Sequence, residues 1–554
     1  MQLIFWTLLC NIIHAQSLRL SVQGKNEKET QIIDSIGYKK INSNYSELET
    51  ELFSLQQKIN KLGYLESNLE DLTKESDSSY VAHLHLNNHY KSIHIYIKEL
   101  DPKYLKALNL KTLDGYVLIS IAELEDTLEA LNTEIANTGD PFSSLELTDL
   151  KKINDYTLSA KLKITSNKIR TIDGIVIKGY EKFPRSYVKH FLKIKTSQTF
   201  NLSKIKEQTN LLNDLQFANQ IKDPEVLFTK DSTTLYLYIE KTKANSFDGF
   251  LGFGTNTETQ NLEFDGYLNL ALINNLNYGE SLNLLYKSDE NDQRTFNLDV
   301  SLPYLFKTPI GIDANLNIFR RDSSFVNITQ SANLFYQLNS RNKLSVGIHG
   351  INSNNLLDNS TSTITDYKST FYKINYSFIK PQYYDNLFPT NFLFDFSTGF
   401  GKRSSEFKTE RQTQFQVNSY KIFNLNDRNS LFTRLNGAYL NSDQYLENEL
   451  YRFGGINSIR GFEENSILAN LYAVLNTEYR YRLSNNLYIH SVLDASYFEN
   501  QLNNTKEKLF GIGFGFGLLT NTGLFKLNYS NGKTENQSFK FSDSKIHISI
   551  SSTF

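Results

Sequence analysis

The sequence predicts a transmembrane antiparallel β-barrel of about 16 strands, preceded by three small α+β domains. Three observations support this fold class. Helical and strand patterns mix up to about residue 243, and helical periodicity ends after the small polar linker Lys241–Asn245. From Ser246 to Phe554 the chain divides into strands of about ten residues, the length of tilted transmembrane strands. A glycine-bracketed loop at Arg452–Glu463 carries an arginine whose natural environment in a barrel is the polar lumen.

The N-terminus, residues 1–15, is typical of a secretory signal peptide. A short apolar core runs from Leu3 to Ile13, although the first residues carry no Lys or Arg. A buried N-terminal strand is the alternative. Cys10 is the chain's only cysteine, so removal of this segment leaves a mature protein without disulfides. The formal net charge of −2 gives no reason to expect a nucleic-acid partner.

The part before the linker contains three copies of one unit, each a strand, two helices and two strands. The copies repeat about every 70 to 80 residues and predict three consecutive domains, with boundaries at 17–89, 90–168 and 169–243. In the third copy, Ile172–Tyr180 alternates like a strand, Pro184 opens a short helix, and Asn201 is placed to cap a second helix. Its closing strands are Val226–Phe228 and Leu235–Ile239.

The first two copies follow the same order less clearly. In the middle copy we expect a strand at Ser92–Ile97, a helix at Ile121–Ala136, and strands near Ser143–Leu147 and Thr157–Ile164. In the first copy we expect a helix at Ser46–Leu62 and a closing strand at Tyr80–Leu86. Unrelated α+β scaffolds are the alternative, because each unit by itself is generic.

The second half alternates short turns with longer polar loops. Turns such as Leu483–Asn486 and Thr520–Gly523 suit the periplasmic side of a barrel, and loops such as Asn352–Asp366 and Asn441–Ser466 suit the outside. An even number of strands places both ends of the barrel on the periplasmic side, where the α+β domains must lie. A soluble β-sandwich is the alternative.

The last strand, Lys545–Phe554, alternates strictly. Ile546, Ile548, Ile550 and Phe554 fall on one face, as expected for a strand that presents this face to lipid.

These patterns resemble a known family. The α+β units resemble POTRA domains, and Ile459-Arg460-Gly461-Phe462 resembles the (V/I)RG(F/Y) signature of the BamA/TamA superfamily of outer-membrane assembly proteins. In that family the signature lies in the loop between the eleventh and twelfth strands, where our strand count also places it. Three modules before the barrel most resemble the TamA-like arrangement. Phe554 resembles the terminal aromatic by which outer-membrane barrels are recognised for insertion.

The resemblance implies a latch in the lumen. The loop would fold inward, and Arg460 would pair with acidic residues of the wall, because guanidinium suits two-pronged carboxylate pairing. Asp494 resembles the acidic residue of the family's thirteenth strand, and Glu478 resembles that of the twelfth; we expect Asp494 to be the closer partner. Gly461 would allow close backbone passage and Phe462 would pack as a wedge.

The resemblance also implies a lateral seam, since the first and last strands of the family's barrels pair weakly. Here the seam would lie between residues 247–254 and 546–554, and its expected residues are Phe250, Gly252, Ile548 and Ile550. An incoming polypeptide could add to this exposed edge as a further strand.

The implied function is a non-enzymatic assembly or translocation factor of the bacterial outer membrane, with its N-terminal domains in the periplasm. Its expected partners are membrane lipid and unfolded or nascent outer-membrane or secreted proteins. The sequence leaves open whether an inner-membrane partner also spans the periplasm to reach it. The first alternative is a two-partner secretion pore that exports one dedicated substrate. The second is an outer-membrane enzyme.

Motifs for chemistry are missing from the sequence. No GxSxG elbow is present. The alternating glycines of Phe510–Gly517 precede no helix, so they predict a strand and not a nucleotide loop. His83, His85 and His89 lie near one another, but a solvated strand face explains them better than a metal site. We therefore expect no catalytic residues, metal or cofactor.

Overall fold

The computed structural model describes residues 17–554 except 99, 167, 256–261, 289–292, 322–323, 358–363, 383–384, 407, 521–522, 538–539, 541–543 and 552–554. Side chains are described throughout this part, apart from residues 250–255, 262–266 and 549–551. The expected signal peptide and Phe554 therefore lie outside the described residues. The chain forms two compact units, one of residues up to 171 with 199–204 and one of residues 172–198 with 205–554.

The first α+β domain has two helices packed on a four-stranded sheet of order β2-β1-β4-β3. Asn44 caps the second helix by accepting a hydrogen bond from the Glu47 amide at 2.8 Å. Leu48, Leu55 and Ile59 of that helix are fully buried against the sheet. The elements are β1 (Leu18–Gln23), α1 (Glu27–Ile36), β2 (Ile41–Asn42), α2 (Tyr45–Lys61), β3 (Asn68–Ser76) and β4 (Ser79–His85).

The second α+β domain has a five-stranded sheet of order β6-β7-β5-β9-β8. Its β6–β7 hairpin is absent from our expected unit. Asp114 and Gly115 make its two-residue turn with φ of 52° and 83°, the left-handed conformation that an Asp-Gly turn adopts. The elements are β5 (Ser92–Tyr96), α3 (Pro102–Ala107), β6 (Thr112–Leu113), β7 (Tyr116–Ser120), α4 (Ile121–Asn137), β8 (Ser144–Asn154) and β9 (Thr157–Thr165).

The third α+β domain has a three-stranded sheet of order β10-β12-β11. As the sequence predicts, the Asn201 side chain accepts a hydrogen bond from the Lys204 amide, at 2.7 Å. The closing strand β11 begins eight residues before the expected Val226. The elements are β10 (Gly174–Gly179), the π-helix η1 (Tyr187–Phe191), α5 (Leu202–Asn210), the 3-10 helix η2 (Leu211–Asp214), β11 (Ala218–Phe228) and β12 (Thr233–Lys241).

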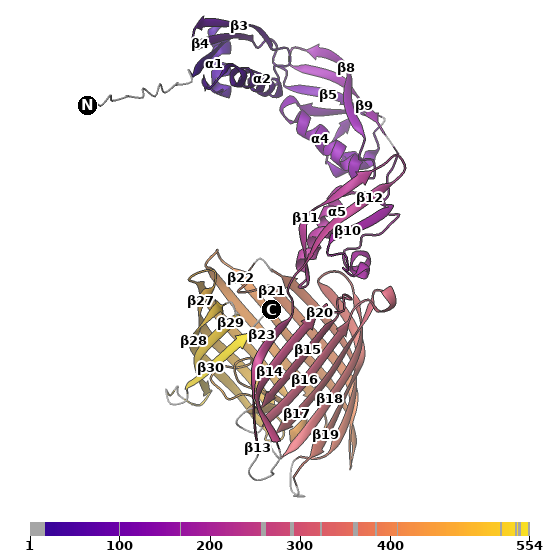
Figure 1. Cartoon of the computed structure of the whole chain (residues 1–554), viewed down its shortest axis with the longest axis vertical. Helices are drawn as coiled ribbons and strands as arrows, with labels where there is room; N and C mark the ends of the chain where they lie inside the picture. The colour runs from indigo at the N-terminus through magenta and orange to yellow at the C-terminus, as the bar shows by residue number, and fades with distance from the viewer. Residues whose placement is uncertain are drawn as a thin grey trace, which may run out of the picture. The chain divides into compact units, whose positions relative to one another are not determined.

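The remaining chain forms one 16-stranded antiparallel sheet that curves into a barrel (Figure 1), which confirms the predicted fold class. Its strands are β13 (Ser246–Thr255), β14 (Leu262–Ile273), β15 (Ser281–Ser288), β16 (Gln293–Leu302), β17 (Ile310–Arg321), β18 (Phe325–Gln337), β19 (Asn342–Asn355), β20 (Tyr367–Pro381), β21 (Thr390–Ser405), β22 (Thr409–Asn424), β23 (Asn429–Asn441), β26 (Leu471–Arg482), β27 (Leu487–Asn500), β28 (Thr505–Thr520), β29 (Gly523–Thr534) and β30 (Ser544–Ser551). The short helix η3 (Leu305–Lys307) precedes β17.

Side chains alternate between the two faces of the barrel wall. In β20, Tyr372 and Ile374 are exposed on the outer face, whereas Phe371 and Lys373 are buried on the inner face. Apolar residues outside and polar residues inside are typical of a wall that meets lipid. None of the described helices is long and apolar enough to span a membrane.

Most of the third α+β domain belongs to the same compact unit as the barrel and packs on its turns. The Tyr180 hydroxyl accepts a hydrogen bond from the Asn274 amide at 2.9 Å and donates one to Asn277 at 2.5 Å. The Tyr187 ring lies edge-on to Tyr304, with centroids 4.8 Å apart. Burial raises the pKa of Tyr187 well above its usual range, so this phenol stays neutral. These contacts mark the end of the barrel on which the third α+β domain packs.

Candidate functional site

The loop between β23 and β26 lies between the eleventh and twelfth strands of the barrel, where the sequence places it. It contains the 3-10 turn η4 (Glu447–Glu449) and a hairpin of β24 (Tyr451–Phe453) and β25 (Ile467–Ala469). We call η4 the stem turn and residues 454–466, between the two hairpin strands, the loop tip. The loop tip carries the predicted latch residues.

Arg460 of the loop tip is buried between two carboxylates of the wall. Its Nε and Nη2 donate to the two oxygens of Asp494 at 2.9 and 2.7 Å, and its backbone amide donates to Asp494 at 3.0 Å. Its Nη1 donates to Glu478. Arg460 is only 4% exposed, so two-pronged pairing with Asp494 offsets a large desolvation cost. The structure thus brings together the three residues that the sequence singled out.

Arg480 extends this cluster and was not predicted as a site residue. Its Nε donates to the second oxygen of Glu478 at 2.8 Å. Its guanidinium lies 4.0 Å from the ring centroid of Phe432 and 4.6 Å from that of Phe388. Two positive and two negative side chains therefore alternate in one buried line. The sequence carried one signal for it, since Glu478 and Arg480 are two residues apart in a strand and must share a face.

The charge of Arg460 is maintained by its partners. Burial by itself would lower the pKa of Arg460, but the Asp494 and Glu478 carboxylates hold it above its usual range. The guanidinium therefore stays a cation at any physiological pH, and the cluster is suited to fixing the loop tip rather than to proton transfer.

Apolar residues of β24 and of the loop tip pack beside the charges. Ile459 is fully buried, and the Phe453 ring stacks on Tyr472 of β26 with centroids 4.7 Å apart. Phe462 is partly buried against the same cluster, in the wedge position that the sequence suggests. The buried members of the cluster are Phe453, Ile459, Ala469, Val474, Phe498 and Leu509.

Two glycines allow the backbone of the loop tip to touch the wall. Gly461 has φ of 92°, and a Cβ there would lie 2.4 Å from the backbone nitrogen of Gly532. A Cβ on Gly511 would lie 2.4 Å from the carbonyl oxygen of Arg460. Gly511 belongs to the glycine-rich segment that the sequence assigns to a strand, and that segment is β28. Of the alternating glycines of this segment, Gly511 makes room for the loop tip.

The loop tip also reaches the last strand. The Gly461 amide lies 3.5 Å from Nε2 of His547, and Glu463 forms an ion pair with Lys545 at 3.0 Å. His547 and Lys545 were not predicted as site residues. They alternate with Ile546 and Ile548, which are exposed on the outer face as the sequence expects.

The residues of the expected seam lie in the two terminal strands of the sheet. Phe250 and Gly252 belong to β13, and Ile548 and Ile550 belong to β30. β13 pairs with β14 and β30 pairs with β29. Over the described backbone no ladder joins β13 to β30, which stand at opposite ends of the strand order.

Two of the three predicted histidines, His83 and His85, pair with acidic side chains. His83 lies 2.5 Å from Asp71, and His85 lies 3.1 Å from Glu70. Within the described part of the chain, no three His, Cys, Asp or Glu side chains gather as a metal site would require.

Comparison with known proteins adds family matches to this geometry. A model described as the Omp85 superfamily domain matches residues 274–554, and a POTRA model, described as a surface antigen variable number repeat, matches residues 170–241. No curated protein sequence matches the chain significantly.

Solved structures show the same fold at low sequence identity. BamA from Haemophilus ducreyi lacking POTRA domains 1–3 is 16% identical with a TM-score of 0.52, over 84% of this chain and all of that one (100%). CdiB from Acinetobacter baumannii is 16% identical with a TM-score of 0.52, over 84% and 90% of the two chains. CdiB from Escherichia coli is 14% identical with a TM-score of 0.53, over 92% and 97%.

Proposed function

Because this chain belongs to the Omp85 superfamily, a family of outer-membrane barrels with periplasmic POTRA domains, we propose that it inserts or exports polypeptides at the outer membrane. Its latch would be Ile459, Arg460, Gly461 and Phe462 of the loop tip, held by Asp494 and Glu478. Its lateral seam would lie between β13 and β30. We assign no catalytic residue to it.

One observation carries this proposal: the loop tip that is anchored through Arg460 also contacts β30. Arg460 binds strands β26 and β27, while Gly461 and Glu463 approach His547 and Lys545 of the last strand. A change in the latch would therefore act directly on one edge of the seam. An exposed strand edge presents unpaired backbone groups that an unfolded client can bind.

The alternative is a two-partner secretion pore with one dedicated substrate. The fold does not distinguish assembly from dedicated secretion, because the TM-scores for BamA and for the two CdiB structures are nearly equal, at 0.52, 0.52 and 0.53. Three small α+β sheets precede the barrel, which supports the TamA-like arrangement, although the POTRA model matches only the third.

Depletion of the protein followed by comparison of outer-membrane proteomes separates these functions. We expect broad loss of barrel proteins if the protein assembles them. Loss of one secreted protein would favour the dedicated pore, and an unchanged proteome would refute both.

The latch is tested by complementation of the depleted cells. Arg460→Ala should insert into the membrane yet fail to restore the proteome, because Asp494 and Glu478 lose their buried partner. Arg428→Ala is the matched control, since Arg428 is an exposed arginine of the turn between β22 and β23. Full restoration by Arg460→Ala would rule out the latch.

The seam is tested by photo-crosslinking. A photoreactive residue in place of Ile548, on the exposed face of β30, should capture a newly made client. The same residue in place of Ile374, on the exposed face of β20, is the control. Equal capture at both positions would contradict a seam between β13 and β30.

A further inference from the structure

Lys373 is a buried cation of the barrel wall without a carboxylate partner. It lies on the inner face of β20 and is only 9% exposed. Its ladder partners are Gly347 of β19 and Gly399 of β21, so neither neighbouring strand places a side chain directly beside it. Among the described residues, its ammonium forms no hydrogen bond or ion pair. A buried charge without a partner costs free energy, so contact with an opposite charge would be favourable.

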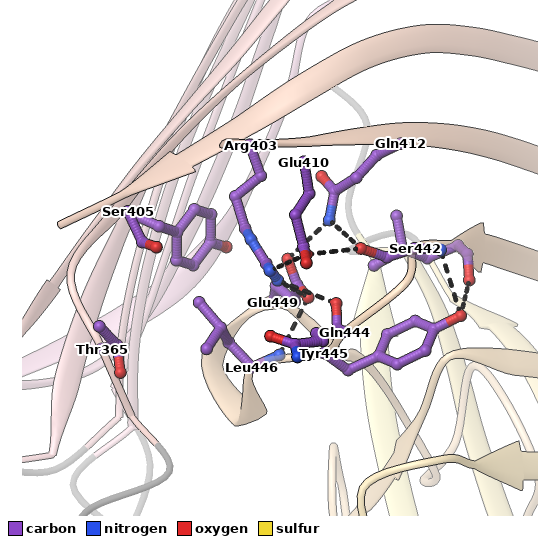
Figure 2. A network of polar contacts seen from close by, with 12 residues as sticks. Thr365, Arg403, Ser405, Glu410, Gln412, Ser442, Gln444, Tyr445, Leu446 and Glu449 are labelled. Carbon is purple, nitrogen blue, oxygen red and sulfur yellow. Dashed lines mark hydrogen bonds and ion pairs between the residues drawn. The ribbon is translucent and has the colours of Figure 1, made fainter. Parts of the chain in front are cut away.

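Arg403 of the next strand, β21, shows the usual treatment of such a cation. It is 3% exposed, and its guanidinium donates to Glu449 of the stem turn through Nη1 and to Glu410 of β22 through Nη2 (Figure 2). Gln412 of β22 also donates to Glu449, at 2.9 Å (Figure 2). Arg403 thus receives two carboxylates from the chain itself, so its charge needs no anion from outside.

A polar cavity of about 480 Å³ in the lumen is lined by Lys373, and the carboxylates of the same cavity have other partners. Asp313 forms an ion pair with Lys343 at 2.9 Å. Asp395 accepts a hydrogen bond from the Ser377 hydroxyl at 2.6 Å. Neither carboxylate is bonded to Lys373, so the cavity contains a cation that the described side chains leave uncompensated.

Two further donors lie close to Lys373 on the same inner face. The ladder joins Gly347 to Lys373 and His349 to Phe371, so His349 of β19 is a diagonal neighbour of Lys373. Ser331 of β18 is the direct ladder partner of His349. Both side chains line the cavity, and neither forms a hydrogen bond with the described residues. An imidazole and a hydroxyl can each donate a hydrogen bond. Three successive strands therefore direct three unpartnered donors into one cavity.

This set of donors suits one class of ligand. An oxyanion has several oxygens that can accept from an ammonium, a ring N–H and a hydroxyl at the same time. Hydrogen bonds between ionised groups are shorter and stronger than neutral ones. A neutral solute would leave the ammonium of Lys373 uncompensated, and a cation would be repelled by it.

We propose that Lys373, His349 and Ser331 form a binding site for an oxyanion, a phosphate or a carboxylate group, inside the barrel. Lys373 supplies the opposite charge, and His349 and Ser331 supply neutral donors. The site goes beyond the proposed function, because it holds whether the protein inserts or exports its clients.

Isothermal titration calorimetry of the purified full-length protein with inorganic phosphate tests this site. Lys373→Met should weaken phosphate binding by roughly tenfold or more, because it removes the charged donor. Lys368→Met is the matched control, since Lys368 is an exposed lysine of the same strand, and it should bind phosphate as the wild type does.

Acetate, titrated in parallel, identifies the group that the site takes. Tighter binding of acetate would assign the site to a carboxylate, and tighter binding of phosphate would assign it to a phosphate group. If the wild type binds neither anion, or if Lys373→Met binds both as the wild type does, the proposal is overturned.

A second variant and a second measurement apply even if Lys373→Met fails to fold. His349→Phe removes one neutral donor and should weaken phosphate binding by roughly threefold. Phosphate should also raise the midpoint temperature of thermal unfolding of the wild type more than that of His349→Phe, because a ligand stabilises the state that binds it. Equal rises in the two proteins would refute the site. Client assembly plays no part in these measurements, so failure of the proposed function would leave them interpretable.

Discussion

Two buried arginines attach the same loop to different parts of the barrel wall, and the positive charge lies on the loop in one case and on the wall in the other. Arg460 is a cation of the loop that binds carboxylates of β26 and β27. Arg403 is a cation of the wall that binds a carboxylate of the loop, Glu449. Both are almost fully buried, at 4% and 3% exposure, and each lies between two acidic side chains.

The reversal shows that the loop has two attachments that can be released separately. The loop tip lies beside β30 and the expected seam, whereas the stem turn binds the ends of β17 to β22. Loss of Arg460 leaves the Glu449 pairing intact, and loss of Arg403 leaves the Asp494 pairing intact. We expect release of the loop tip to affect the seam, and release of the stem turn to leave the loop tip beside β30.

The largest effect should come from removing both arginines together. Each change breaks a buried pair, which typically costs roughly 3–5 kcal/mol, and the two free energies should add because they share no partner. Trypsin cleavage after Arg452, between the two attachments, measures release of the loop in the purified protein. The double variant Arg403→Gln/Arg460→Ala should be cleaved faster than either single variant. If the double variant is cleaved no faster than the more rapidly cleaved single variant, one attachment holds the loop by itself.

Lysine substitutions should separate the two attachments by their geometry. The Arg460 guanidinium donates two hydrogen bonds to Asp494, a geometry that a lysine ammonium cannot reproduce. The Arg403 guanidinium instead donates one hydrogen bond to each of its two carboxylates. Arg460→Lys should therefore destabilise the docked loop by about 2 kcal/mol and Arg403→Lys by about 1 kcal/mol. The shift in the urea concentration needed for cleavage after Arg452 measures both. Equal shifts would argue against a special role of the two-pronged pair.

The smallest effect should come from the exposed ion pair of the loop tip. Glu463 and Lys545 are 65% and 41% exposed, so Glu463→Gln should change the stability of the docked loop by about 1 kcal/mol or less. The same urea assay at low and high salt checks this, because salt screens an exposed pair. A larger loss that persists in high salt would show that the pair contributes more than its exposure predicts.

Local signals in the sequence predicted much of this arrangement. The alternating strands predicted the barrel, and Asn201 predicted a helix cap that the structure contains. The Asp114-Gly115 turn was also readable, yet the β6–β7 hairpin was missed because strands of two and five residues are too short for a periodic pattern.

The sequence by itself determined the fold class, the place of the loop between the eleventh and twelfth strands, and candidate partners for Arg460. These depend on alternation within strands and on a short motif, which are local properties of the chain. Only the tertiary structure decided that the loop tip meets β30 and that Arg403 holds Glu449. Those contacts join residues whose neighbours along the chain say nothing of their partners, since barrel closure and the path of the loop bring them together.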